Sequence, residues 1–259
     1  MKDTITVLSS VAILLLTTAF SFAGKGDFYQ IKIYHFSTSD QESVIDEYLE
    51  KAYLPAMHRA GIEHIGVFKP VASTEGNKPS EKLIYVLIPF SSQKEFSKID
   101  SKLAKDQQFQ SAGAKYLNAP YTNPPYDRIE SILLNAFEKH PKYGVPDLSG
   151  PNKDRIYELR SYEGHTEKIS ENMFNDGDEV GLFKRLGFNA VFYGEVISGP
   201  TMPNLMYMTT FENKADRDAH WDAFRSDPYW KELSSLPQYQ NNVSKNVTTF
   251  LYPTDYSDI

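Results

Sequence analysis

The stretch RIYELRSYEG, residues 155–164, decides how this chain is expected to fold. Glu158, Arg160 and Tyr162 alternate with the more apolar side chains Tyr157 and Leu159. A period of two residues is typical of a β-strand, whose successive side chains point to opposite faces. The sequence therefore predicts a strand with one apolar face and one face that carries an acid, a base and a phenol.

A second copy of this pattern occurs earlier in the chain. FYQIKIYHF (28–36) aligns with IYELRSYEG (156–164), so that Gln30, Lys32 and Tyr34 correspond in order to Glu158, Arg160 and Tyr162. Two further pairs of segments match in the same order: RAGIEHIGVF (59–68) with RLGFNAVFYG (185–194), and LIYVLIPFSSQKEF (83–96) with LMYMTTFENKADRD (205–218). Matches in a constant order indicate an internal repeat.

Each copy is predicted to contain strand, helix, strand, strand, helix and strand. The expected strands are 28–36, 62–69, 82–90 and 128–134 in the first copy and 155–163, 188–197, 205–211 and 247–252 in the second. The expected helices are 40–59, one capped by Ser92, 166–186 and one capped by Asn213, with a turn at Pro228–Leu233. This order is typical of the ferredoxin-like unit. We expect an α+β fold of two tandem ferredoxin-like (βαββαβ) repeats that pack sheet to sheet as an α/β barrel.

The chain divides into four segments. Residues 1–23 have the pattern of a secretory signal peptide, with an apolar run and small residues before the expected cleavage site. Residues 24–135 and 155–259 form the two repeats, and residues 136–154 form a linker rich in proline and glycine. We therefore expect an exported protein, periplasmic or extracellular. No later apolar run approaches the ~20 residues of a membrane span.

Composition excludes several classes of function. The chain has no cysteine, which excludes disulfides, thiolate metal sites and a cysteine nucleophile. A net charge of −7 disfavours a nucleic-acid partner. The 17 tyrosines and 16 phenylalanines suit aromatic-lined pockets as well as cores.

The second copy resembles the NIPSNAP family. The resemblance rests on its opening YELR-Y strand and on a helix with arginine and tryptophan that ends in Asp227, Pro228 and Trp230. It covers about residues 155–257, whereas 28–134 is similar to a divergent copy. The resemblance implies a dimeric α/β-barrel-type fold, a homo-oligomer as one arrangement, and no settled catalytic activity.

The polar faces of the two first strands are the candidate ligand site. We expect the side chains of both copies to face one cleft between the sheets: Glu158, Arg160, Tyr162, Gln30, Lys32 and Tyr34. Arginine and lysine beside tyrosine favour a small anionic or aromatic ligand. The alternative is that Glu158 and Arg160 form a structural ion pair.

No histidine pattern predicts a metal site, and no cofactor is expected. Haem-binding proteins of this barrel class make His165 or His220 a conceivable haem ligand, as an analogy of fold. Three functions stay open: a small-molecule-binding protein, an oxidoreductase of the monooxygenase or haem type, and a protein-interaction module. The sequence identifies no catalytic residues and does not decide whether the protein is an enzyme.

Overall fold

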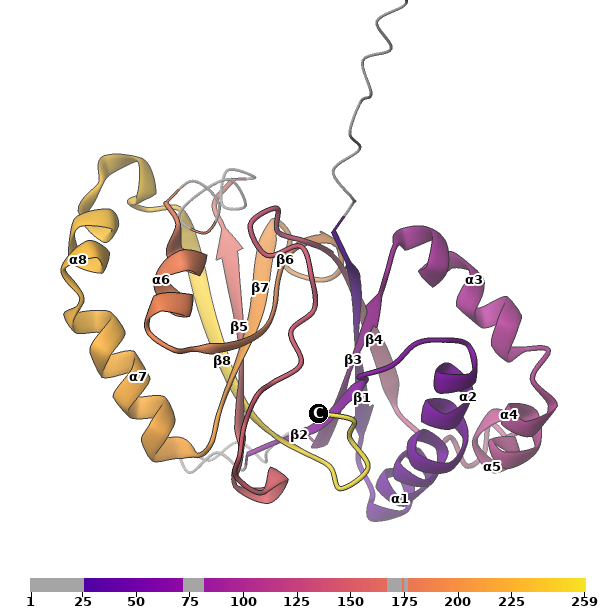
Figure 1. Cartoon of the computed structure of the whole chain (residues 1–259). Coiled ribbons are helices and arrows are strands. Elements are labelled where there is room, and N and C mark those ends of the chain that lie inside the picture. The colour runs from indigo at the N-terminus through magenta and orange to yellow at the C-terminus, as the bar shows by residue number, and fades with distance from the viewer. Residues whose placement is uncertain (1–25, 72–81, 167–173, 175–176) are drawn as a thin grey trace, which may run out of the picture.

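A computed structural model describes residues 26–71, 82–166, 174 and 177–259 (Figure 1). The signal-peptide prediction for residues 1–23 lies outside these residues. The helix predicted over 166–186 also lies partly outside them, and its described part is α6 (Glu179–Arg185).

Within the described residues, eight strands form one closed antiparallel barrel in the order β1-β3-β2-β8-β5-β7-β6-β4. The strands are β1 (Phe28–Phe36), β2 (Gly66–Pro70), β3 (Lys82–Phe90), β4 (Arg128–Ala136), β5 (Ile156–Gly164), β6 (Asn189–Ser198), β7 (Asn204–Phe211) and β8 (Val243–Pro253). The first four strands are neighbours in the order β4-β1-β3-β2, and the last four in the order β8-β5-β7-β6. The halves join edge to edge where β2 pairs with β8 and β4 pairs with β6. The α/β barrel is confirmed, as a single closed sheet.

Helices cover the outside of the barrel on two opposite sides (Figure 1). One side carries α1 (Ser39–Tyr48), the π-helical turn η1 (Leu49–Tyr53), α2 (Leu54–Arg59), α3 (Gln93–Leu103), α4 (Gln107–Ala112) and α5 (Ala114–Leu117). The other side carries α6, α7 (Lys214–Ser226) and α8 (Pro228–Ser235). Two short 3-10 turns, η2 (Asn152–Asp154) and η5 (Pro237–Tyr239), complete the elements.

Local signals set the helix boundaries. Ser92 and Asn213 cap α3 and α7 by accepting hydrogen bonds from backbone N–H groups in the first turn, as the sequence predicts. Gly61 and Gly187 adopt φ of 88° and 77°, the left-handed conformation with which glycine ends a helix. The prediction of a turn at Pro228–Leu233 is wrong. Asp227 caps a helix there, and Pro228 fits its first turn because that position needs no N–H donor.

The barrel interior is filled by apolar side chains from both halves. It contains Tyr29, Ile31, Ile33, Phe68, Tyr85, Leu87, Ile132, Leu134, Tyr157, Leu159, Val191, Phe192, Val196, Met206, Met208, Leu251 and Ile259. The alternation of apolar and polar residues in 28–36 and 155–163 predicts that Tyr29, Ile31, Ile33, Tyr157 and Leu159 pack beneath the helices, and this prediction is wrong because all five lie in the barrel interior. Closure removes both sheet edges and isolates the interior from water, so the more apolar face of each strand turns inward.

The C-terminal segment returns to the first half and covers one end of the barrel. Ile259 is 3% exposed and belongs to the interior cluster. The Oδ2 atom of Asp258 lies 2.8 Å from both the backbone nitrogen of Ile65 and Nε2 of His58. The C-terminal end lies beside β2 in Figure 1. A side chain from the end of the second half thus completes a core that begins in the first.

We expect Ile259→Ala to lower the free energy of unfolding by about 2 kcal/mol, because it removes buried methyl groups from the barrel interior. Urea denaturation measures the change. Val243→Ala, at a position 37% exposed on β8, is the control and should change stability by less than about 0.5 kcal/mol. Equal losses in the two variants would contradict the role of Ile259 in the core.

Candidate functional site

Glu158 on β5 is fully buried and holds α7 against the barrel. Its Oε1 atom accepts hydrogen bonds from Arg160 Nε at 2.6 Å and Arg217 Nη2 at 2.9 Å. Its Oε2 atom accepts from Arg217 Nε at 2.7 Å and Trp221 Nε1 at 2.9 Å. Four donors satisfy this carboxylate. The contacts favour the structural alternative, in which Glu158 pairs with Arg160, and they add Arg217 and Trp221, which sequence analysis did not connect to it.

The electrostatics keep Glu158 ionised. Burial by itself would raise the pKa of this carboxyl, but the hydrogen bonds and charges of Arg217 and Arg160 outweigh burial and hold the pKa below its ordinary value. A carboxylate that is ionised and hydrogen-bonded by four donors is a poor proton acceptor. Glu158 therefore acts as an anchor between β5 and α7.

Arg160 connects this anchor to a chain of tyrosines. Its Nη1 atom donates to the Tyr162 hydroxyl at 3.0 Å, and the hydroxyls of Tyr162 and Tyr207 are 2.9 Å apart. The guanidinium carbon of Arg160 lies 3.9 Å from the centre of the Trp221 ring, a cation–π contact. Arg160 and Tyr162 are partly exposed, whereas Tyr207 is fully buried. The hydrogen bonds that join Arg160, Tyr162 and Tyr207 thus lead from near the surface into the protein.

Glu179 is a second buried carboxyl in this half, and one of its oxygens is unsatisfied. The residue is 3% exposed, and its Oε2 atom has no hydrogen-bond partner among the described residues. The Tyr193 hydroxyl is also buried and also has no hydrogen-bond partner among the described residues. The charge of Glu179 contributes to the raised pKa of both Tyr193 and Tyr207, which is consistent with their proximity. We call Arg160, Tyr162, Glu179, Tyr193 and Tyr207 the Glu179 cluster.

Aromatic rings surround the Glu179 cluster. The Phe174 ring centre is 5.1 Å from that of Tyr207, 6.0 Å from Tyr193 and 6.3 Å from Tyr162.

Burial raises the pKa of Glu179 to about 8, although the charge of Arg160 opposes the shift. A carboxyl that is mostly neutral near pH 7, with one oxygen that has no partner among the described residues, is chemically available to donate or accept a proton.

Glu179 is not among the site residues that the sequence predicts. It lies in NDGDE, residues 175–179, which reads as a helix break, although α6 begins at Glu179. The available signal was a carboxylate directly before the apolar residues of a short helix. Its electrostatic influence on Tyr193 of β6 and Tyr207 of β7 joins elements that sequence spacing does not connect.

The equivalent residues of the first half occupy the opposite side of the barrel. Gln30 Nε2 donates to Ser131 Oγ at 2.8 Å, and Lys32 lies 5.0 Å from the centre of the Tyr53 ring. Tyr34 is 1% exposed and packs with the helix-side cluster of the first half. All three lie between β1 and the helices α1 to α5.

The prediction of one shared cleft is therefore wrong. The barrel interior, filled by apolar side chains, separates Gln30, Lys32 and Tyr34 from Glu158, Arg160 and Tyr162. Each set faces the helices of its own half, because the inward positions of β1 and β5 are taken by their alternating apolar residues. Gln30, Lys32 and Tyr34 thus lie together on one side of the barrel. Glu158, Arg160 and Tyr162 lie together on the opposite side.

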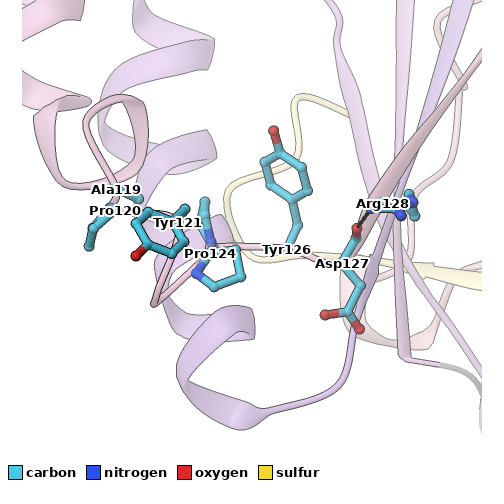
Figure 2. Close-up of a pocket in the computed structure, with 8 residues that line it drawn as sticks. Ala119, Pro120, Tyr121, Pro124, Tyr126, Asp127 and Arg128 are labelled. Carbon is cyan, nitrogen blue, oxygen red and sulfur yellow. Dashed lines mark hydrogen bonds between the residues drawn. The ribbon is translucent and has the colours of Figure 1, made fainter.

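A surface groove of about 700 Å³ lies near the Tyr34 side of the first half (Figure 2). It is lined by Ala119, Pro120, Tyr121, Pro124, Pro125, Tyr126, Asp127 and Arg128. Figure 2 shows the side chains of Tyr126 and Asp127 pointing in opposite directions. Tyr126 is shared between the groove and the tyrosines that surround Tyr34, since its ring centre is 6.2 Å from that of Tyr34.

The histidines that sequence analysis associated with haem lie in different surroundings. His165 is exposed. Nδ1 of His220 is 2.8 Å from the backbone oxygen of Asp216, and its ring packs on Phe188 and Phe211. Within the described ranges, no group of three or more histidine or acidic side chains could hold a metal ion. The helices in those ranges are too short or too polar to cross a membrane.

Glu158→Gln should lower the free energy of unfolding by roughly 3 kcal/mol at pH 7, because two arginines then lose their buried counter-charge. Since the pKa of Glu158 is lowered in the folded state, its contribution is present above the ordinary pKa of 4.5 and is lost as the pH falls through the folded-state value. The difference from the parent protein should therefore shrink in acid. Urea denaturation at several pH values measures it.

Glu163→Gln is the matched control on the same strand. Glu163 is 3.4 Å from Lys245, which is 62% exposed, so this ion pair should contribute less than about 1 kcal/mol. A loss after Glu158→Gln no larger than that of the control would contradict the anchoring role.

The chain has detectable relatives among known families and structures. Residues 157–258 match the NIPSNAP family model. No curated protein matches the sequence. A solved structure from Lactobacillus acidophilus NCFM, named "putative monooxygenase", is 13% identical and aligns with a TM-score of 0.58 over 88% of this chain and 94% of its own.

Two further structures extend the comparison. A protein from Fusobacterium nucleatum with the same name is 10% identical and aligns with a TM-score of 0.53 over 88% of this chain and 93% of its own. A NIPSNAP family protein from Agrobacterium tumefaciens is 23% identical, with a TM-score of 0.35, over 40% of this chain and 96% of its own. At these identities the first two structures establish a shared fold and nothing about activity.

The resemblance to the NIPSNAP family is thus confirmed for the second copy of the repeat. This agreement extends over β5 to β8 and the helices between them. The chain carries a NIPSNAP domain at residues 157–258, and that domain forms one half of a closed α/β barrel.

Proposed function

We propose that the protein binds a small aromatic acid at the Glu179 cluster. The observation that carries the proposal is the buried carboxyl oxygen of Glu179, which has no hydrogen-bond partner among the described residues and is accompanied by the unpaired Tyr193 hydroxyl. Burying polar atoms without partners costs about 1–3 kcal/mol for each group. Such groups need an explanation, and a ligand that completes their hydrogen bonds provides one.

The chemistry of the cluster suits an aromatic acid. Tyrosine and phenylalanine rings offer faces and edges against which an aromatic ring packs. Arg160 adds a positive charge, and the Tyr162 hydroxyl lies beside it. Partial exposure of Arg160, whose side chain is 15% exposed, gives the cluster an outer end toward solvent.

The protonation state of Glu179 should control binding. With a folded-state pKa of about 8, Glu179 is mostly neutral at pH 6.5 and donates a hydrogen bond to an anion. As the pH rises through 8, the carboxyl ionises and repels the anion. Binding should therefore be strongest on the acid side of this pKa.

Isothermal titration calorimetry with 4-hydroxybenzoate at pH 6.5 and pH 8.5 tests the proposal. We expect roughly fourfold weaker binding at pH 8.5, because ionisation of Glu179 removes the competent form. Glu179→Gln should bind similarly at both pH values, and Tyr193→Phe should bind more weakly than the parent at both.

Glu195→Gln is the control, since Glu195 is exposed on β6. This variant should keep the pH dependence of the parent. The absence of saturable binding, or the same pH dependence in Glu179→Gln as in the parent, would contradict the proposal.

A second candidate is an oxidoreductase that uses the same cluster. Its support is the fold shared with the two proteins named as monooxygenases, together with the buried ionisable carboxyl of Glu179. Measurement with an oxygen electrode should then show oxygen uptake that requires both the protein and 4-hydroxybenzoate and that Glu179→Gln greatly reduces. Saturable binding with no oxygen uptake would favour the binding protein.

We also infer that the two halves are tandem ferredoxin-like repeats. The support is the strand order, since β4-β1-β3-β2 in one half corresponds position by position to β8-β5-β7-β6 in the other. The β-α-β-β-α-β order of elements in each half is that of the ferredoxin-like unit. Export of the protein stays a proposal that rests on the pattern of residues 1–23.

A further inference from the structure

Lys32 has an unusual environment for a partly buried lysine. No ion pair or hydrogen bond joins its ammonium group to another described residue, and its identified contact is with the face of the Tyr53 ring at 5.0 Å. On β1 it pairs in register with the buried Val86 of β3 and with Ser131 of β4. A partly buried ammonium group without a counter-ion can form a charge-assisted hydrogen bond with an anion.

Five tyrosines gather beside Lys32, and we call them the Tyr34 cluster: Tyr34, Tyr48, Tyr53, Tyr116 and Tyr126. Tyr48 and Tyr116 stack with ring centres 3.8 Å apart. Tyr34 meets Tyr116 and Tyr126 edge to face at 6.5 and 6.2 Å. Burial raises the pKa of Tyr34, Tyr48 and Tyr53, so their phenols keep their protons and remain potential hydrogen-bond donors at neutral pH.

The π-helical turn η1 helps to assemble this cluster. In an α-helix, residues five apart in sequence point roughly 140° away from each other. Wider turns bring such residues toward one face, and the ring centres of Tyr48 and Tyr53 lie 5.7 Å apart. Both rings therefore reach the same region between the helices and β1.

The surface groove adjoins the cluster through Tyr126, which lines one and contacts the other. Apolar side chains are exposed in the same part of the fold: Leu117 and Ile129 are each 37% exposed, and Tyr121 is 94% exposed. Ile129 pairs in register with Tyr34 on the neighbouring strand. A groove of about 700 Å³ falls in the range of small-molecule sites.

We propose that the Tyr34 cluster, with Lys32 and the adjoining groove, forms a second ligand site that binds an aromatic carboxylate. The carboxylate would supply the counter-ion that Lys32 lacks, and phenol hydroxyls would donate hydrogen bonds to it. The aromatic body would pack against tyrosine and proline in the groove. This site lies in the opposite half from the Glu179 cluster and does not depend on the function proposed there.

Calorimetric titration with 2-naphthoate and its neutral amide, naphthalene-2-carboxamide, tests the proposal at pH 7.5. Lys32→Met keeps the aliphatic stem over Tyr53 and removes the charge. It should weaken 2-naphthoate binding about tenfold, equivalent to about 1.4 kcal/mol, and change amide binding less than twofold. Lys51→Met is the matched control because Lys51 is 62% exposed on η1, and it should leave both affinities unchanged.

Because the Glu179 cluster is a candidate site for the same class of ligand, the Lys32→Met and Lys51→Met titrations are repeated in the Glu179→Gln background, where the same tenfold loss and the same unchanged affinity are expected. An affinity for 2-naphthoate that Lys32→Met leaves unchanged in the Glu179→Gln background overturns the proposal.

Chemical protection provides a second measurement that needs no variant. Reductive methylation of the unmodified protein, read by peptide mass spectrometry, should be slowed at Lys32 by 2-naphthoate but not by the amide, while methylation at Lys51 stays constant. Equal labelling of Lys32 with and without 2-naphthoate also overturns the proposal.

Discussion

Two short lengths of backbone pairing close the barrel, and the other features depend on this closure. β2 meets β8 through Phe68, Lys69 and Pro70, and β4 meets β6 across a register shift at Leu133 and Leu134. With both edges of each four-stranded unit paired, the inner faces of all strands share one dry interior. That constraint assigns the apolar face of β1 and β5 to the inside and leaves their polar face for the helices.

The two carboxylates of the NIPSNAP half illustrate how environment separates roles. Glu158 and Glu179 are both buried, but Glu158 has four hydrogen-bond donors and a lowered pKa, whereas Glu179 has an unpaired oxygen and a pKa raised to about 8. Arg160 interacts with both, since it bonds Glu158 directly and its charge opposes the rise in the pKa of Glu179. The first carboxylate stabilises the packing of α7, and the second is the group on which the proposed binding site rests.

The two halves use one architecture for different polar environments. Where the second half places Glu158 and Arg160 as an ion pair, the first half places Gln30 and Lys32, and no carboxylate of the described residues pairs with this lysine. Tyrosines replace the arginine and tryptophan network on the helix side. A barrel that encloses no shared cleft thus has two separate helix-side regions, each able to diverge without altering the common core.

The sequence by itself determined the α/β class, most strand boundaries and the helix caps, because period-two alternation, Ser92 and Asn213 as caps, and Gly61 and Gly187 as helix ends are local signals. It also brought together Glu158, Arg160 and Tyr162, which are neighbours on one face of one strand. Only the tertiary structure decided which face of that strand is the inside, because this depends on whether the sheets stack or close. It likewise decided that Arg217, Trp221 and Glu179 join the site, since the contacts between β5 and the helices α6 and α7 span long stretches of chain that no local pattern encodes.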